Sequence, residues 1–137
     1  MKLRRVALII PINEKFEITL QRRKGFIDKK TDRDYGFFGG GLEKGETVEQ
    51  ALKREVKEEL SLDIKTIKSL KFFKTYSYKK DENSARELNI FLCDIKDVKN
   101  MKVLEGKPAT LKIEETFDLN LSEMDKKILK DILSKTN

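Results

Sequence analysis

Five of the seven glycines in this 137-residue chain fall within ten residues, directly ahead of a predicted helix. They are Gly36, Gly39, Gly40, Gly41 and Gly45. Such a cluster marks backbone that must bend tightly or approach another group closely. Thr47 then stands at a typical helix N-cap position, with Gln50 three residues on in the spacing of a capping box. We therefore expect a glycine-rich loop that leads into a helix.

The predicted helix carries acids on its apolar side. Its apolar residues recur at helical spacing: Val48, Ala51, Leu52, Val56 and Leu60. At 3.6 residues per turn, Glu55 and Glu59 fall inside this apolar arc, and Glu58 lies at its edge. A run of glutamates is ordinarily a solvated helix face, but a buried carboxylate needs a partner or a metal ion. Because Arg54 cannot neutralise three acids, the pattern predicts a bound cation.

The available ligands narrow the choice of cation. The chain has no histidine, and its one cysteine, Cys93, lies in an apolar run, where we expect it to be buried. Oxygen ligands favour Mg²⁺, with Mn²⁺ as a possible substitute. Mg²⁺ keeps bound waters and completes its shell with substrate phosphates. The pattern thus indicates metal-assisted attack of water on phosphorus, with a carboxylate of the cluster taking the proton.

The remaining chain alternates strand and helix patterns. We expect strands at 3–12, 16–20, 64–76, 88–95 and 108–113, joined by a turn at 13–15, a loop at 25–34 and a charged turn at 79–84. A closing helix is expected from Leu121, with Ser122 as its cap and Asp125 at the third helical position. No repeat or linker interrupts the pattern, which predicts a single α/β domain over residues 1–137.

The net charge is +6, from 30 Lys and Arg against 24 Asp and Glu. Lysine-rich surfaces often serve solubility alone, and no nucleic-acid motif or run of five like charges occurs, so we expect no nucleic-acid binding. The apolar stretch 6–10 is too short for a secretion signal, and no segment has membrane-spanning length. The expectation is a soluble cytoplasmic protein with no membrane partner, as a monomer or homodimer.

One segment closely resembles a known motif. Gly40, five residues, Glu46, seven residues and then 54–62, Arg-Glu-Val-Lys-Glu-Glu-Leu-Ser-Leu, is similar to the box of the Nudix hydrolase family. With this composition, such a match arises by chance in about one chain per million. Ser61 replaces the glycine of the box, at a position where a left-handed residue often ends a helix, but it removes no ligand. The preceding Phe-Phe-Gly-Gly at 37–40 resembles the family's Phe-Pro-Gly-Gly.

The resemblance implies an α/β/α sandwich with a mixed β-sheet, in which the box forms a loop, a helix and a second loop. It implies that the metal ligands are Glu55, Glu58, Glu59 and the backbone carbonyl of Gly39. Arg54 would orient these acids through a salt bridge. Glu46 would tie the loop to the helix.

Further positions follow from the same resemblance. Arg22 would hold a substrate phosphate, and Gly40 would lie against the substrate. A further catalytic acid is expected from a later loop, with Glu105 preferred over Glu114 and Glu115.

The substrate implied by the resemblance is a small-molecule nucleotide. The leading hypothesis is a MutT-like conversion of a nucleoside triphosphate, normal or oxidised, to monophosphate and pyrophosphate. The alternatives are a nucleotide sugar, a dinucleoside polyphosphate, an RNA 5′ end, or a non-catalytic domain that binds nucleotide or RNA. Phe37 and Asp118 could line the base pocket together with Phe117, for which a core position is favoured. The sequence leaves the base specificity open.

Overall fold

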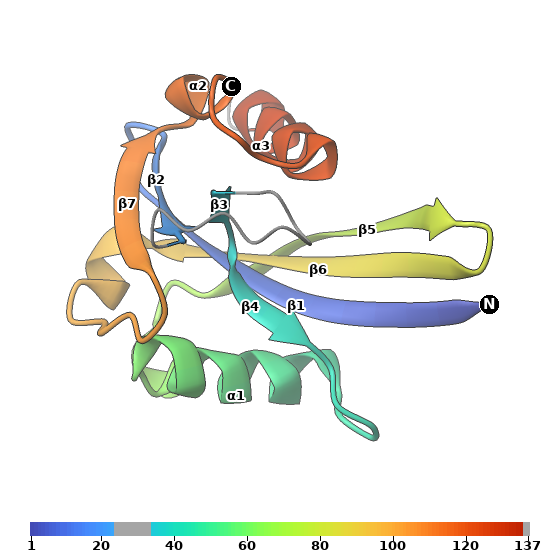
Figure 1. Cartoon of the computed structure of the whole chain (residues 1–137). Helices are drawn as coiled ribbons and strands as arrows, with labels where there is room; N and C mark the ends of the chain where they lie inside the picture. Colours follow the sequence, from blue (N-terminus) through green and yellow to red (C-terminus); the bar gives the residue numbers. More distant parts are fainter. Residues whose placement is uncertain (24–33, 136–137) are drawn as a thin grey trace.

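A computed structural model of the chain describes residues 1–23 and 34–135. It contains a mixed seven-stranded sheet with helices on both faces (Figure 1). The strands are β1 (Lys2–Ile12), β2 (Glu17–Arg22), β3 (Tyr35–Gly36), β4 (Phe38–Gly41), β5 (Lys71–Asp81), β6 (Ser84–Asp94) and β7 (Lys107–Lys112). The helices are α1 (Val48–Leu60), α2 (Ile113–Thr116) and α3 (Glu123–Lys135), with short 3₁₀ turns η1 (Ile64–Thr66) and η2 (Ile95–Val98).

The N-terminal strand lies in the middle of the sheet. The strand order is β3-β2-β1-β6-β5, with β4 added to β1 and β7 to β2. Strands β1 and β6 run parallel over their whole length, from Lys2 opposite Ser84 to Ile12 opposite Asp94, and every other pair is antiparallel. Burial on both faces explains why the middle of β1 is a continuous apolar run rather than an alternating one.

Two apolar cores flank the sheet. Helix α1 packs on one face through the residues of its predicted apolar arc: Ala51, Leu52, Val56 and Leu60. Helix α3 covers the opposite face through Ile128, Leu129 and Ile132. Figure 1 shows the two helices on opposite sides of the strands. This arrangement confirms the α/β/α sandwich with a mixed sheet.

The expected glycine-rich loop is partly a strand. Residues Phe38–Gly41 form β4, which pairs with β1 so that Gly41 lies opposite Val6. Gly39 has φ = +129°, and a Cβ there would collide with the carbonyl oxygen of Ala7. Only glycine allows this close pairing. Because β4 also contacts α1, the strand brings the glycines beside that helix.

Both ends of α1 agree with the sequence. The Gln50 N–H donates to Thr47 Oγ1 at 3.1 Å, and the Thr47 N–H donates to Gln50 Oε1 at 2.9 Å, which completes the predicted capping box. At the other end Ser61 has φ = 57°, and its N–H donates to the carbonyl of Lys57. Serine therefore holds the left-handed position that favours glycine.

The expected strand at 64–76 was wrong at both ends. The Asp63 carboxylate accepts a hydrogen bond from the Lys65 N–H at 2.9 Å, and this local bond turns residues 64–66 into η1. The strand begins at Lys71 and continues to Asp81. Strand β6 starts at Ser84, so the charged turn expected at 79–84 shortens to residues 82–83.

The C-terminal third follows the expectation more closely. Strand β6 ends one residue early, because the Asp94 carboxylate caps η2 by accepting from the Lys96 N–H at 2.9 Å. Strand β7 matches within one residue, whereas α2 was not expected. Ser122 caps α3 as predicted, since its Oγ accepts from the Asp125 N–H at 3.0 Å. The loop expected at 25–34 lies outside the described residues except for Asp34.

Two further expectations can be compared with the structure. Cys93 is buried, and burial raises the pKa of its thiol to about 12, which agrees with its expected role as a small apolar residue. Among the helices of the described ranges, none is long and apolar enough to cross a bilayer.

Candidate active site

Helix α1 presents its acids as the helical spacing predicts. The Glu55 side chain is 13% exposed and Glu59 is half-buried, whereas the Glu58 side chain is 59% exposed. Glu55 and Glu59 lie one turn apart on the side of α1 that packs against the sheet. Helix packing thus draws two carboxylates towards the glycines of β4 and leaves the third at the rim.

Arg54 organises this acid cluster. Its Nε and Nη2 atoms donate to the two carboxylate oxygens of Glu46, each at 2.8 Å, in a bidentate pair. Its Nη1 donates to Glu55 at 2.8 Å and to Glu58 at 3.4 Å, and Nη2 also donates to the Gly41 carbonyl at 3.0 Å. One guanidinium therefore connects the loop, β4 and two of the acids.

The Arg54–Glu46 pair has a clear electrostatic signature. Its hydrogen bonds lower the pKa of Glu46 to about 2 and raise the pKa of Arg54 above its usual range. Glu43 lies 2.9 Å from the Arg54 Nε and is a further partner that the sequence analysis did not identify. Glu43 could have been identified from its position three residues before Glu46. The Glu43 N–H donates to Glu46 Oε1 at 2.7 Å.

Glu59 lies against the backbone of β4. Its Oε1 accepts a hydrogen bond from the Gly39 N–H at 3.3 Å. Burial raises the pKa of Glu59 to about 7, and the negative charges of Glu55, Glu105 and Glu58 add to this rise. The hydrogen bond from Gly39 acts in the opposite direction but does not offset burial. Glu59 therefore lies where negative charge is in excess.

Gly40 makes room for Glu55. A Cβ at residue 40 would lie 2.7 Å from Glu55 Oε1 and 2.8 Å from its carboxyl carbon. Any larger residue would displace that carboxylate. The glycine pair at 39–40 thus serves two acids: Gly39 donates its N–H to Glu59, and Gly40 leaves space for Glu55.

A later loop completes the cluster. The Lys102 N–H donates to the carbonyl of Leu60 at 2.9 Å, and the Leu104 N–H donates to that of Glu59 at 3.1 Å, so the loop binds the C-terminal end of α1. This contact places the exposed Glu105 close enough for its charge to raise the pKa of Glu59. Of the other two candidates, Glu115 caps α2 by accepting from the Lys112 N–H at 2.9 Å, and Glu114 is exposed on α2.

The expected substrate-binding residues are more scattered. Arg22 is exposed at the end of β2, with its guanidinium 6.0 Å from the centre of the Tyr35 ring. Phe37 is only 7% exposed and packs in the core beneath α3, and its expected place in the base pocket stays a prediction. Phe117 also packs against that core, as the sequence favoured, whereas Asp118 is exposed.

The donor set of the cluster suits a hard divalent cation. All its side-chain donors are carboxylate oxygens, and the acids outnumber the single guanidinium among them. Within residues 1–23 and 34–135, no three acids converge as a ready-made metal site, and oxygens of Glu55, Glu58 and Glu59 accept hydrogen bonds from Arg54 or Gly39. Glu58 is 59% exposed, and its contact with Arg54 is the longest in the cluster at 3.4 Å, so it can turn towards an ion. The residues of the cluster therefore fit a divalent metal ion.

Comparison with solved structures agrees with this fold. The MutT protein of Methanosarcina mazei Go1 superposes with a TM-score of 0.73 at 16% identity, covering 99% of this chain and 96% of that one. The ORF135 protein of E. coli gives 0.71 at 21% identity, with coverage of 98% and 91%. A MutT from a study of Aliivibrio salmonicida and Vibrio cholerae gives 0.70 at 20% identity, with coverage of 98% and 99%.

Comparison at the level of sequence gives the family. No curated protein matches the chain significantly. The family model for the NUDIX domain matches residues 2–128, which include β1, the glycines, all of α1 and the loop of Glu105. The chain therefore belongs to the Nudix family and is a pyrophosphohydrolase that acts on acid anhydrides of nucleoside diphosphate derivatives.

Proposed function

We propose that the chain hydrolyses a nucleoside triphosphate, normal or oxidised, to the monophosphate and pyrophosphate, with Mg²⁺ as its metal ion. The observation that carries this proposal is the group of acids on α1, held by Arg54 against the bare backbone of Gly39 and Gly40. Carboxylate oxygens beside open backbone suit a Mg²⁺ ion that shares its shell with substrate phosphates. The E. coli dihydroneopterin triphosphate pyrophosphohydrolase, which has a similar fold, supports the choice of a triphosphate.

The residues of the chain divide the work between positioning and proton transfer. Glu55, Glu58 and Glu59 would hold the metal, which when bound neutralises the diphosphate and lowers the pKa of a water. Arg54 keeps the acids in place through its bidentate tie to Glu46. The Gly39–Gly40 backbone lets the phosphates approach without a side chain in the way.

Glu105, the remaining acidic residue of the cluster, is the proposed general base. Glu105 is exposed and lies near Glu59 without a place in the Arg54 network. We assign it to accept the proton of the attacking water. Hydrolysis then adds one water across the anhydride between the α- and β-phosphates, and the monophosphate and pyrophosphate are released. Cytoplasmic location and action as a monomer or homodimer remain part of this proposal.

Product analysis tests the proposal. The purified chain would be incubated with Mg²⁺ and a panel of normal and oxidised nucleoside triphosphates, nucleotide sugars and dinucleoside polyphosphates in ¹⁸O-labelled water. Equal amounts of nucleoside monophosphate and pyrophosphate from a triphosphate, with the label in one of these two products, are expected. A diphosphate with inorganic phosphate, or turnover of the sugar or dinucleoside substrates alone, would contradict the proposal.

A further inference from the structure

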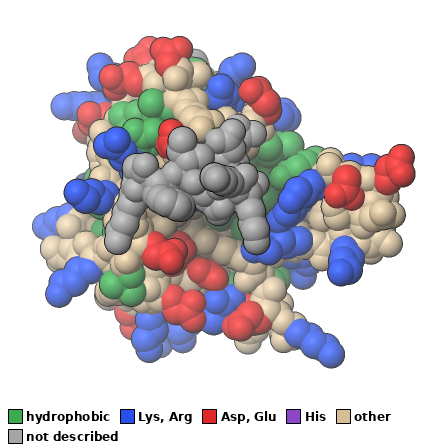
Figure 2. Space-filling view, viewed as in Figure 1, with side chains coloured by type: hydrophobic (Ala, Val, Ile, Leu, Met, Phe, Trp, Pro, Cys, Tyr) green, Lys and Arg blue, Asp and Glu red, His purple; other side chains and the backbone are tan. Residues whose placement is uncertain are grey.

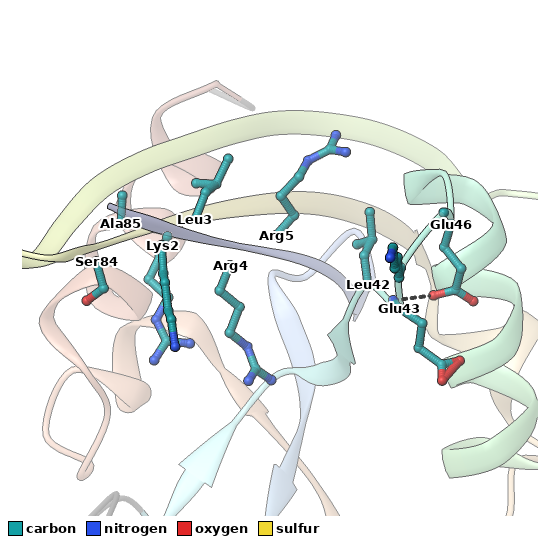
Figure 3. A pocket seen from close by; sticks show the side chains of 12 residues that line it. Lys2, Leu3, Arg4, Arg5, Leu42, Glu43, Glu46, Ser84 and Ala85 are labelled. Carbon is teal, nitrogen blue, oxygen red and sulfur yellow. Dashed lines mark hydrogen bonds between the residues drawn. The ribbon is translucent and has the colours of Figure 1, made fainter.

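A basic hollow lies beside the loop that precedes α1. It has a volume of about 620 Å³ and lies between the N-terminal end of β1, the start of β6 and residues 42–46 (Figure 3). Its basic lining residues are Lys2, Arg4, Arg5, Lys44 and Arg86. The two acidic residues that line the hollow, Glu43 and Glu46, both pair with Arg54 of the acid cluster. The hollow therefore has an excess of positive charge.

The sheet register brings two arginines together. Arg4 of β1 lies directly opposite Arg86 of β6, although 82 residues separate them in the sequence. The next pair along, Arg5 and Glu87, forms an ion pair at 2.6 Å on the other face. Among the ion pairs of the described residues, none includes Arg4 or Arg86. Like charges directly opposite each other are unfavourable, and a bound anion would relieve this repulsion.

The two arginines share a face with an aromatic ring. Strand alternation places Arg4 and Arg86 on the same face as Val6 and Leu88, which belong to the core beneath α3. Figure 3 shows Arg4 on one side of β1 and Arg5 on the other. Tyr78 of β5 lies opposite Arg86 and packs partly against the same core. We name Arg4, Arg86 and Tyr78 the arginine–tyrosine row.

The row and the acids of α1 lie on opposite sides of β4. A Cβ at Gly41 would lie 3.1 Å from Arg4 Nη2, and the Gly41 carbonyl accepts a hydrogen bond from Arg54. Arg54 in turn donates to Glu55. Figure 2 shows basic side chains over the projecting end of β1, β5 and β6, beside the acidic side chains over α1. Strand β4 is thus the element that links the row to the acids, and a ligand longer than one nucleotide is needed to contact both.

We propose that the arginine–tyrosine row binds a single-stranded oligonucleotide. Arg4 and Arg86 bind its phosphodiester groups, and Tyr78 stacks on a base. The row crosses three strands spaced by about 4.8 Å, so it extends over about 10 Å, which suits a chain of nucleotides better than one nucleotide. This part of the proposal rests on the proposed function: the 5′-triphosphorylated end of the oligonucleotide enters the acid cluster.

Binding is tested without catalysis. Fluorescence anisotropy would be measured with 3′-labelled ten-nucleotide RNA and DNA single strands, in the presence of EDTA. The double variant Arg4→Gln/Arg86→Gln is expected to weaken binding at least about tenfold and to reduce the salt dependence of binding by the equivalent of two phosphates. The control Lys15→Gln/Lys99→Gln removes the same charge from exposed sites at the opposite end of β1 and after η2. It is expected to change affinity less than about twofold.

The ring has its own test. Tyr78→Phe keeps stacking and packing, so its affinity is expected to match the wild type, whereas Tyr78→Leu is expected to lose about fivefold or more. Thermal unfolding of each variant shows whether the fold is retained. Absence of wild-type binding to both strands, or equal weakening in the arginine and lysine double variants, would overturn the proposal.

Measurements of kcat/KM distinguish a failure of this proposal from a failure of the proposed function. The Arg4→Gln/Arg86→Gln variant is expected to lower kcat/KM for a 5′-triphosphorylated ten-nucleotide strand and to leave that for a nucleoside triphosphate unchanged. If wild-type protein hydrolyses neither substrate, the proposed function fails, and the anisotropy result still decides the row. If both substrates are hydrolysed with the arginine variant unaffected, the row is not a binding surface and the proposed function stands.

Discussion

Replacing Glu59 with glutamine is expected to stabilise the metal-free protein at pH 8 while removing its activity. The physical reason is the raised pKa of Glu59, about 7 against an ordinary 4.5, which arises mainly from burial and then from neighbouring acids. A carboxyl whose folded pKa lies above its unfolded value favours folding only while protonated. Stability is therefore lost as the pH rises from about 4.5 to about 7.

The size of the effect follows from the same shift. Each pKa unit corresponds to about 1.4 kcal/mol, so the full shift is worth about 3 kcal/mol. Partial exposure of Glu59 reduces this to about 1–2 kcal/mol, or an increase in Tm of about 3–6 °C. Glutamine keeps an oxygen to accept from the Gly39 N–H.

Urea unfolding in EDTA at pH 8 and pH 5 is the assay. The stability difference between wild type and Glu59→Gln is expected to be largest at pH 8 and to shrink by most of its value at pH 5. Glu58→Gln is the control, because its side chain is 59% exposed, and a change below about 0.5 kcal/mol is expected. A Glu59→Gln protein that is less stable at pH 8, or a difference independent of pH, would refute this reasoning.

Three further substitutions test the local geometry. Ser61→Gly is expected to raise the stability by about 0.5–1 kcal/mol in thermal unfolding, because φ is 57° at this position; an unchanged or lower Tm would count against left-handed strain. Gly40→Ala is expected to lower kcat by about tenfold to a hundredfold, because its Cβ would meet the Glu55 carboxylate, and full activity in a steady-state assay would disprove that contact. Tyr76→Phe is expected to cost about 1–2 kcal/mol in urea unfolding, because it removes the 2.7 Å hydrogen bond to Asp131; an unchanged midpoint would show that this bond contributes nothing.

The parts of the fold that the sequence predicted well are those with strong local patterns. Helix α1 has five apolar residues at helical spacing and a capping box, and both survive in the structure. The burial of Glu55 and Glu59 followed from the same spacing. The η1 turn was missed because apolar residues interspersed with lysines, as in 64–76, suit either a strand or a turn, and the Asp63 side chain decides between them.

Features that depend on strand register could not be predicted. The burial of Phe37 in the core beneath α3 was not predicted from the sequence. Arg4 and Arg86 are far apart in the sequence and belong to no nucleic-acid motif or run of like charges. The sequence analysis therefore predicted no nucleic-acid binding. The parallel pairing of β1 with β6 makes them neighbours, and no local pattern carries that information.

The central claim is that the acids of α1 hold a magnesium ion for pyrophosphate release. The most direct measurement is the initial rate of pyrophosphate formation from the best triphosphate against Mg²⁺ concentration, for wild type, Glu58→Gln, Glu59→Gln and the control Glu49→Gln. Glu49 is an exposed acid in the first turn of the same helix. We predict saturable dependence on Mg²⁺ in the wild type and control, and loss of the rate by at least about a hundredfold in the other two variants. A rate that is independent of added metal, or equal in all four proteins, would contradict the account.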